Sequence, residues 1–167
     1  MFSKSTTPRT ISSDIIKMLD LLDLTENDAH YVKYTNETSF TAEFENCHVN
    51  NLVKRKLYGG ELVFGWIIWE NKDVNFIEAN FHSLWTDGKK KLYDITPRRD
   101  KEEFIFFVQD GHREIEFIKH SNSPAIKTFN NLRIQNGQII TGINSVLAIM
   151  TSPLIREYGL LNDIWNM

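Results

Sequence analysis

The stretch ELVFGWIIWENKDVNFIEANFHSLWTDGKKKLYDITP, residues 61–97, decides the fold. Its turn signals are Asn71-Lys72-Asp73 and the strong hairpin dipeptide Asp87-Gly88. Between these turns the residues are mainly aromatic and β-branched, which favours strands. The pattern predicts three consecutive strands, at 61–70, 74–86 and 89–96, the last of them ended by Pro97.

Helices are expected on both sides of this stretch. The segment 47–58 has apolar residues at helical spacing and basic residues in its second half, and Gly59-Gly60 ends it. An N-terminal helix is predicted from a cap at Ser12 or Ser13 to about Leu24. Two short C-terminal helices are predicted at 142–150 and 153–165.

The remaining segments have weaker patterns. Residues 29–46 fit either short strands or coil, and residues 120–138 are predicted to be mostly loop. Two further strands, 102–108 and 112–119, are predicted to pair as a hairpin around Gly111. A run of strands flanked by helices defines an α+β fold.

Composition limits the classes of function. The chain has 167 residues, of which 41% are hydrophobic and 25% charged, typical of one globular domain. We expect a flexible tail at 1–10 and a single domain at 11–167. The net charge of −3 gives no support for nucleic-acid binding, and Lys89-Lys90-Lys91 and Arg98-Arg99 are interpreted as solvated loop charges. No signal peptide or membrane segment is recognised, so we expect a cytoplasmic protein with no membrane partner.

Three residues in the middle of the chain have the chemistry of a thiol-nucleophile site. Cys47, the only cysteine, lies where a helix begins, and a helix N-terminus stabilises a thiolate. His82 lies in the second predicted strand and Asp94 in the third. If these strands fold back around Asp87-Gly88, His82 pairs near Tyr93 and Asp94 lies beside it. Thiol, base and orienting acid are then all present.

This order of residues resembles the transglutaminase-like branch of the papain-like cysteine enzymes. The matching segments are CHVNNLVKRKL at Cys47, EANFHSLW at His82 and LYDITP at Asp94, where Asp-x-Thr-Pro agrees with the family's third motif. The same run also resembles a group of small uncharacterised bacterial proteins. The resemblance covers residues 47–97, and it lacks an identifiable aromatic residue that completes the oxyanion site.

The resemblance implies a papain-like core in which the cysteine helix packs on an antiparallel sheet. It implies that Cys47 attacks an amide through a thioester, with His82 as base and Asp94 as its orienting acid. The reaction would be that of an amidase, deamidase, peptidase or transamidase on a protein or peptide-like substrate, with no cofactor. The backbone N–H of Cys47 would bind the oxyanion, with Asn46 or Asn50 as a weaker second donor.

Other residues are secondary candidates. Glu78 and Asn80 share the strand face of His82, because alternate residues of a strand point the same way. His48 is a candidate for a supporting position beside the thiol. Trp66 and Trp85 are weaker candidates for residues near the substrate, although core packing is the simpler interpretation of each.

Two alternatives remain open. The first is a protein-binding or inhibitory module that uses the same fold without turnover. The second is a metal-dependent hydrolase with Cys47, His48 and His82 as ligands. Adjacent residues on a helix point about 100° apart, which makes it awkward for Cys47 and His48 to share one ion. We therefore expect no metal, and the sequence gives no prediction of oligomeric state.

Overall fold

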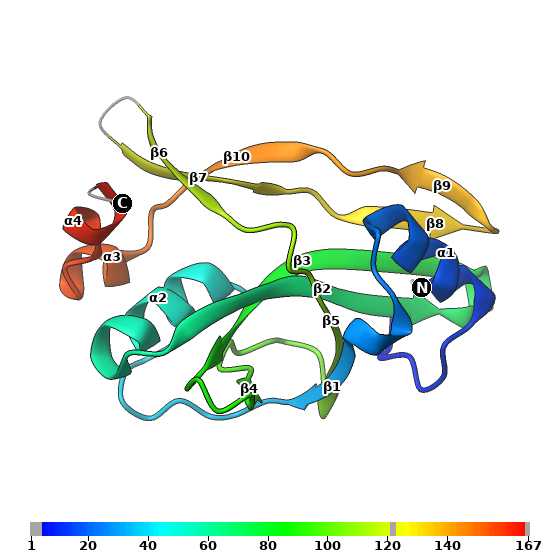
Figure 1. Cartoon of the computed structure of the whole chain (residues 1–167), viewed down its shortest axis with the longest axis horizontal. Coiled ribbons are helices and arrows are strands. Elements are labelled where there is room, and N and C mark those ends of the chain that lie inside the picture. The colour runs from blue at the N-terminus through cyan, green and yellow to red at the C-terminus, as the bar shows by residue number, and fades with distance from the viewer. Residues whose placement is uncertain (1–4, 121–122, 166–167) are drawn as a thin grey trace.

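A long antiparallel hairpin forms the centre of the fold (Figure 1). Its strands are β2 (Glu61–Asn71) and β3 (Phe76–Thr86), which pair along their whole length. A short 3-10 turn, Lys72–Val74, joins them and ends at Asn75, whose φ is +49°. The structure is a computed structural model that describes residues 5–120 and 123–165.

Two antiparallel sheets are present among the described residues. The larger has the order β1-β5-β2-β3-β8-β9, with β4 paired to the far end of β3. The smaller has the order β10-β7-β6. In the larger sheet, the strands other than β2 and β3 are β1 (Ala29–Lys33), β4 (Leu92–Tyr93), β5 (Phe104–Gln109), β8 (Leu132–Gln135) and β9 (Gln138–Thr141). Those of the smaller sheet are β6 (Glu116–His120), β7 (Ser123–Phe129) and β10 (Ser145–Ile149).

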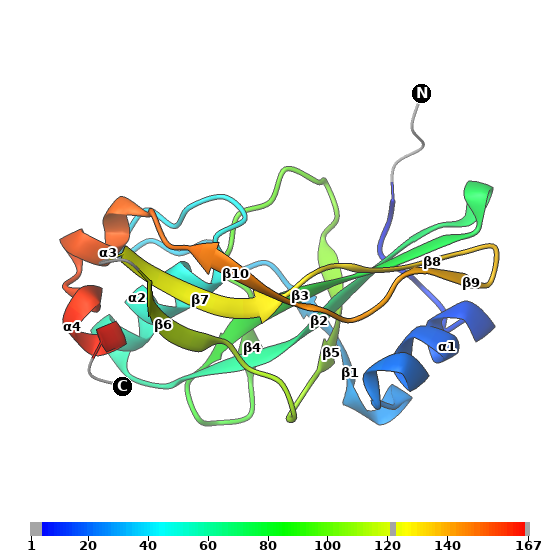
Figure 2. The same ribbon diagram turned by 90° about the horizontal axis from the view of Figure 1, so that it is seen from above.

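The helices lie at opposite ends of the β2–β3 hairpin (Figures 1 and 2). At one end, α1 (Ser13–Leu22) is capped by the Ser12 side chain and buries its apolar face on the sheet. At the other end, α2 (Cys47–Tyr58) packs with the C-terminal helices α3 (Pro153–Glu157) and α4 (Leu160–Trp165). Phe81 of β3 contacts the hydrophobic clusters at both ends.

A gap in the pairing of β3 makes room for α2. On its outer side β3 pairs with β8 over residues 76–79 and with β4 over residues 85–86. Within the described residues, β3 has no strand partner on that side between these two segments, and α2 packs there. Asn51 of α2 donates its side-chain amide to the Ser83 carbonyl at 2.9 Å, as a neighbouring strand would. The start of α2 can therefore contact side chains on both faces of β3.

The α+β class and the antiparallel sheet are confirmed. The predicted helix at 47–58 and strand at 61–70 match α2 and β2 closely, and β3 begins two residues later than predicted. The third strand is much shorter, because only Leu92–Tyr93 pairs with β3. Residues 29–33 form a strand within the segment that fitted either strand or coil.

Several predictions for the C-terminal half are wrong. Strand β6 pairs with β7 in the smaller sheet, so the predicted hairpin between 102–108 and 112–119 does not form. The expected loop at 120–138 contains β7 and β8. The expected helix at 142–150 contains strand β10, which pairs antiparallel with β7. The predicted helix at 153–165 is divided at Gly159, whose φ is +65°.

Residues 5–10, expected as part of a flexible tail, contact the larger sheet. Thr6 and Glu70 exchange two backbone hydrogen bonds, of 2.8 and 2.9 Å. The hydroxyl of Thr7 donates to the Phe104 carbonyl at 2.7 Å. The rest of the expected tail, residues 1–4, lies outside the described residues. Within the described part of the chain, no helix is long and apolar enough to cross a membrane.

Candidate functional site

A cleft of about 660 Å³ contains both Cys47 and His82. It lies between the start of α2, the hairpin β2–β3 and the segment that follows β4. Polar and charged side chains predominate around the two reactive groups. The residues that line it are Ser5, Glu45, Cys47, Ile67, Trp69, Glu78, Asn80, Phe81, His82, Thr96, Arg98, Asp100 and Asn131.

The three proposed catalytic residues come from three separate elements. Cys47 is the first residue of α2, and its side chain is 8% exposed. His82 lies in the segment of β3 that has no strand on its outer side. Asp94 follows β4 directly and is fully buried. The gap in β3 is the feature that lets the helix bring the thiol to the histidine.

His82 and Asp94 are hydrogen-bonded. His82 donates from Nε2 to Oδ1 of Asp94 at 3.2 Å, which leaves Nδ1 as the ring nitrogen for the thiol. The other oxygen of Asp94, Oδ2, accepts from the Arg98 guanidinium. The backbone of Asp94 is also fixed, because its carbonyl accepts from Thr35 N at 2.8 Å. The carboxylate is therefore held rigidly against the imidazole.

The hairpin register differs from the predicted one. Tyr93 lies opposite Trp85, three residues from the expected position opposite His82. The loop 87–91 is longer than a two-residue turn, and the chain leaves β3 after Tyr93 to form a parallel bridge with Tyr34. The backbones of β3 and of the Asp94 segment separate at this point. The side chains of His82 and Asp94 still reach each other between them.

The buried groups Cys47, His82 and Asp94 stabilise one another's ionised forms. Burial alone would raise the pKa of the Cys47 thiol, but the positive charges of His48 and His82 hold that pKa well below its ordinary value. Burial would lower the pKa of His82, but the Cys47 thiolate and the Asp94 hydrogen bond raise it to about 10. Burial opposes ionisation of Asp94 as well, yet His82 and Arg98 lower its pKa. The site favours a thiolate–imidazolium pair.

His48 lies on the side of Cys47 away from His82. Its Nδ1 is 3.7 Å from Cys47 Sγ and 2.9 Å from Ser83 Oγ. Because residues 82 and 83 point to opposite faces of β3, the two imidazoles approach the thiol from two faces of the sheet. His48 was considered from the sequence as a supporting group, and its contact with Ser83 was not foreseen.

Asn46 and Asn50 do not face the thiol cleft as oxyanion donors. The Asn50 side chain is fully buried and donates to the Glu43 carbonyl at 2.8 Å and to Thr96 Oγ1 at 3.2 Å. Asn46 donates to the Glu43 carboxylate at 2.9 Å and lines a different hollow. Both amides hold the loop before α2 in place. The backbone N–H of Cys47 belongs to the first turn of a helix, where N–H groups have no intrahelical acceptor.

The other candidates divide into two groups. Glu78 and Asn80 line the cleft, and Asn80 donates to Glu78 at 3.1 Å. Trp66 is fully buried in the core and donates to Asp110, so it is not near the substrate cleft. Trp85 donates to the Gly59 carbonyl at 2.9 Å and also lies outside the cleft.

Sequence reasoning missed most of the other residues that line the cleft, and two of them, Trp69 and Arg98, bear on the site. Trp69 lines it, because Trp69 pairs with Glu78 and shares the face of β2 that lies beside His82. The strict alternation along β2 is the signal that would have separated Trp69 from Trp66. Arg98, interpreted as a solvated charge, is 11% exposed and contacts Asp94 and Asp100.

Among residues 5–120 and 123–165, no group of three His, Cys, Asp or Glu side chains could hold a metal ion. Cys47, His48 and His82 therefore do not form the zinc site considered from the sequence. His82 directs Nε2 to Asp94, and His48 directs Nδ1 to Ser83.

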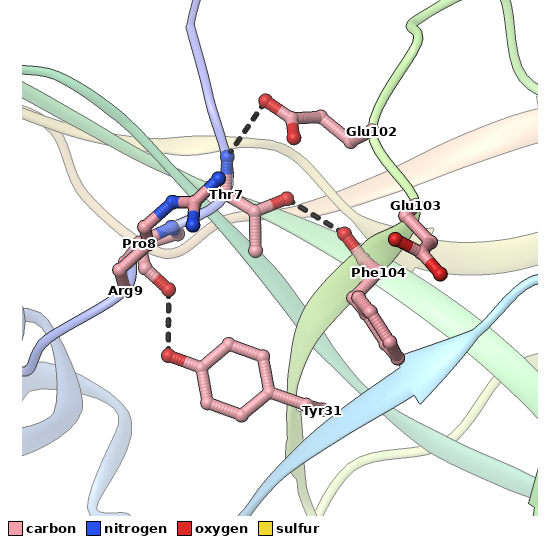
Figure 3. A pocket seen from close by; sticks show the side chains of 7 residues that line it. All are labelled: Thr7, Pro8, Arg9, Tyr31, Glu102, Glu103 and Phe104. Carbon is pink, nitrogen blue, oxygen red and sulfur yellow. Dashed lines mark hydrogen bonds between the residues drawn. The ribbon is translucent and has the colours of Figure 1, made fainter.

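A second hollow, of about 420 Å³, lies beside the N-terminal segment (Figure 3). Its polar groups are used to hold that segment. Thr7 N donates to Glu102 at 3.3 Å, and the Tyr31 hydroxyl donates to the Pro8 carbonyl at 2.6 Å. No thiol or imidazole lines this hollow, so it lacks the chemistry of the Cys47 cleft.

No protein-family model, curated protein or solved structure matches this chain. A function must therefore be argued from the geometry and electrostatics of the site.

Proposed function

We propose that this protein is a cysteine-dependent amide-processing enzyme that acts through a thioester on a protein or peptide-like substrate. The observation that carries the proposal is a single cleft that both Cys47 and His82 line, with His82 hydrogen-bonded to Asp94 at 3.2 Å. Nucleophile, base and orienting acid are the three parts that acyl transfer requires.

In the first half of the reaction, the Cys47 thiolate would attack the amide carbonyl carbon. The carbonyl π electrons move to oxygen, and the Cys47 backbone N–H in the first turn of α2 would bind that oxyanion. When the C–N bond breaks, the His82 imidazolium gives its proton to the departing nitrogen. An amine leaves, and the acyl group stays on sulfur as a thioester.

In the second half, His82 would take a proton from water while the water oxygen attacks the thioester. The C–S bond breaks, and a carboxylic acid leaves. If an amine attacks in place of water, the product is a new amide and the reaction is a transamidation. Asp94 orients His82 and stabilises its charged form in both halves.

We also propose that the helix, hairpin and Asp94 segment correspond to a papain-like core of transglutaminase type. The support is the chain order, in which a cysteine opens a helix, a histidine follows on a strand and an aspartate follows the next strand. The contact of α2 with β3 agrees with the packing of a cysteine helix on a sheet.

The test of the proposal is acetylation of the protein by p-nitrophenyl acetate, followed by intact mass. Because Cys47 is the only cysteine, a hydroxylamine-labile acetyl group reports directly on its thioester. We expect one acetyl group per chain in the wild type and none in Cys47→Ser. His82→Ala should form the thioester more slowly, because its thiol can still attack this activated ester, and it should not hydrolyse the thioester at a useful rate.

Alkylation of Cys47 by iodoacetamide from pH 4 to 9 supplies a second measurement. The rate midpoint should lie well below the value of about 8.5 for a free thiol. An unreactive thiol, or an ordinary midpoint without acetylation, would contradict the enzyme proposal and favour a non-catalytic binding module.

A further inference from the structure

Two histidines contact the same sulfur from different clefts. His82 lines the cleft of about 660 Å³ together with Cys47. His48 lines another, of about 300 Å³, which is formed with residues of β10 and the segment before α3. Cys47 is not part of the lining of the smaller cleft. The two imidazoles are thus separated by the start of α2 and by the backbone of β3.

The position of His48 is fixed by its own contacts. Nδ1 lies 2.9 Å from Ser83 Oγ and 3.7 Å from Cys47 Sγ, within reach of both. The ring is 9% exposed, and the ring of Phe64 and that of Phe81 each lie 5.9 Å from it. These aromatic neighbours offer it no competing hydrogen bond.

Asn51 closes a ring of contacts around the thiol. Its Nδ2 donates to the Cys47 carbonyl at 2.8 Å and lies 3.2 Å from Ser83 Oγ. Its Oδ1 is buried and has no hydrogen-bond partner within the described residues. The Asn51 amide therefore acts in these contacts through its donor nitrogen. It ties Ser83, which positions His48, to the residue that carries the thiol.

We infer that His48 is a positioning residue for Cys47: held by Ser83 and Asn51, it shares with His82 the stabilisation of the thiolate. This inference rests on the proposed function and extends it. His82 alone lines the substrate cleft, so only His82 can pass a proton to a leaving group there. His48 contributes by holding the sulfur in its charged form.

The surrounding charges are compatible with this division of roles, in which His82 transfers protons and His48 stabilises the thiolate. Glu43 is the one carboxylate that lines the smaller cleft within the described residues, and its two oxygens accept from Asn46 and from Ser152. On the other side, the Cys47 cleft contains Glu45, Glu78, Asp100 and Arg98 in addition to His82. Arg98 is paired with Asp94 and Asp100, which leaves the imidazoles of His48 and His82 as the basic side chains that contact the thiol.

The experiment measures the pH dependence of Cys47 alkylation by iodoacetamide in His48→Asn, His82→Ala and the double variant. Asparagine places a neutral polar group near the Nδ1 position, so contact with Ser83 is retained while the imidazole is lost. His30→Asn, at an exposed histidine of β1, is the matched control. Thermal melting verifies that each variant is folded.

We expect His48→Asn to raise the alkylation midpoint by about one pH unit, the lower end of the effect of a nearby opposite charge. His82→Ala should abolish acetylation turnover and yet keep a midpoint below that of a free thiol. The double variant should return to the free-thiol value, and His30→Asn should match the wild type. If His48→Asn does not fold, Ser83→Ala should raise the midpoint by a smaller amount.

A midpoint unchanged in a folded His48→Asn or Ser83→Ala protein would overturn the inference. So would a free-thiol midpoint in His82→Ala alone, because His82 would then account for the whole effect. In either case, acetylation that depends on His82 would leave the proposed function intact. If the wild type is not acetylated but the alkylation midpoint still depends on His48, the proposed enzyme function is rejected. The inference that His48 stabilises the Cys47 thiolate is then retained.

Discussion

Arg98 donates from Nη1 to Oδ2 of Asp94, the carboxylate oxygen that His82 does not use. Asp94 is fully buried, and it joins two cationic groups that approach from different elements. A buried carboxylate with both oxygens engaged stays ionised and has little freedom to rotate. Arg98 therefore belongs to the site as the group that holds the orienting acid.

Replacement of Arg98 by alanine should destabilise the protein by at least about 1–3 kcal/mol, because it leaves Oδ2 of the buried Asp94 carboxylate without its donor while His82 still pairs with Oδ1. The neighbouring Arg99 is exposed, and its guanidinium lies 5.7 Å from the centre of the Phe44 ring. Arg99→Ala should therefore change stability by less than about 0.5 kcal/mol. Urea unfolding of both variants is the measurement. Equal effects in the two would show that Arg98 is not a structural partner of Asp94.

Asp94 should also give stability a dependence on acidic pH. Its pKa is lowered in the folded state, so its contribution is present above the unfolded pKa of about 3.9 and is lost as the pH falls through the folded value. Asp94→Asn should reduce this loss of stability at acidic pH. Asp73→Asn, at an exposed turn, should not. The urea midpoint measured from pH 6 to pH 2 tests this, and parallel curves for wild type and Asp94→Asn would contradict it.

The acetylation rate should have a broad plateau in pH. The active pair needs a deprotonated Cys47 and a protonated His82, and the two pKa values are shifted in opposite directions. The rate should rise with pH in the acidic range as the thiolate forms. It should fall near pH 10, where His82 loses its proton. Asp94→Asn removes a hydrogen bond to the charged imidazole, so the alkaline limb should move to lower pH. An alkaline limb that stays in place in this variant would contradict the role of Asp94.

The elements around the site were predictable from local signals. Apolar spacing and Gly59-Gly60 define α2, and aromatic alternation defines β2 and β3. The residue order from Cys47 to Asp94 was enough to place the thiol and the histidine in one cleft. The helix and strand signals each lie within one element or one hairpin, where local periodicity reports directly on structure.

The errors came from long-range pairing. Strand β10 has apolar residues that also fit a helix, and its pairing with β7 decides the outcome. Arg98 was interpreted as a loop charge because only tertiary structure brings it to Asp94. His48 lacked a partner in the sequence for the same reason, since Ser83 is far along the chain.

Gly65 lies directly opposite His82 in the β2–β3 ladder, and β5 passes close on its other side. A Cβ atom at Gly65 would lie 2.3 Å from the Val108 carbonyl oxygen and 2.5 Å from the Phe107 ring. The first of these atoms is backbone, so relief would require a strand to move. Gly65→Ala should therefore destabilise the protein by at least about 1–3 kcal/mol, the usual cost of overpacking.

The same substitution should weaken the site as well, because displacement of β2 moves its partner strand and hence the His82 imidazole. The alkylation midpoint of Cys47 should shift toward that of a free thiol. Gly111→Ala is the control, since a Cβ atom there meets nothing within 4 Å. Urea unfolding and alkylation of both variants test the two consequences separately. A Gly65→Ala protein as stable as Gly111→Ala would mean that β5 does not approach β2 as closely as the structure requires.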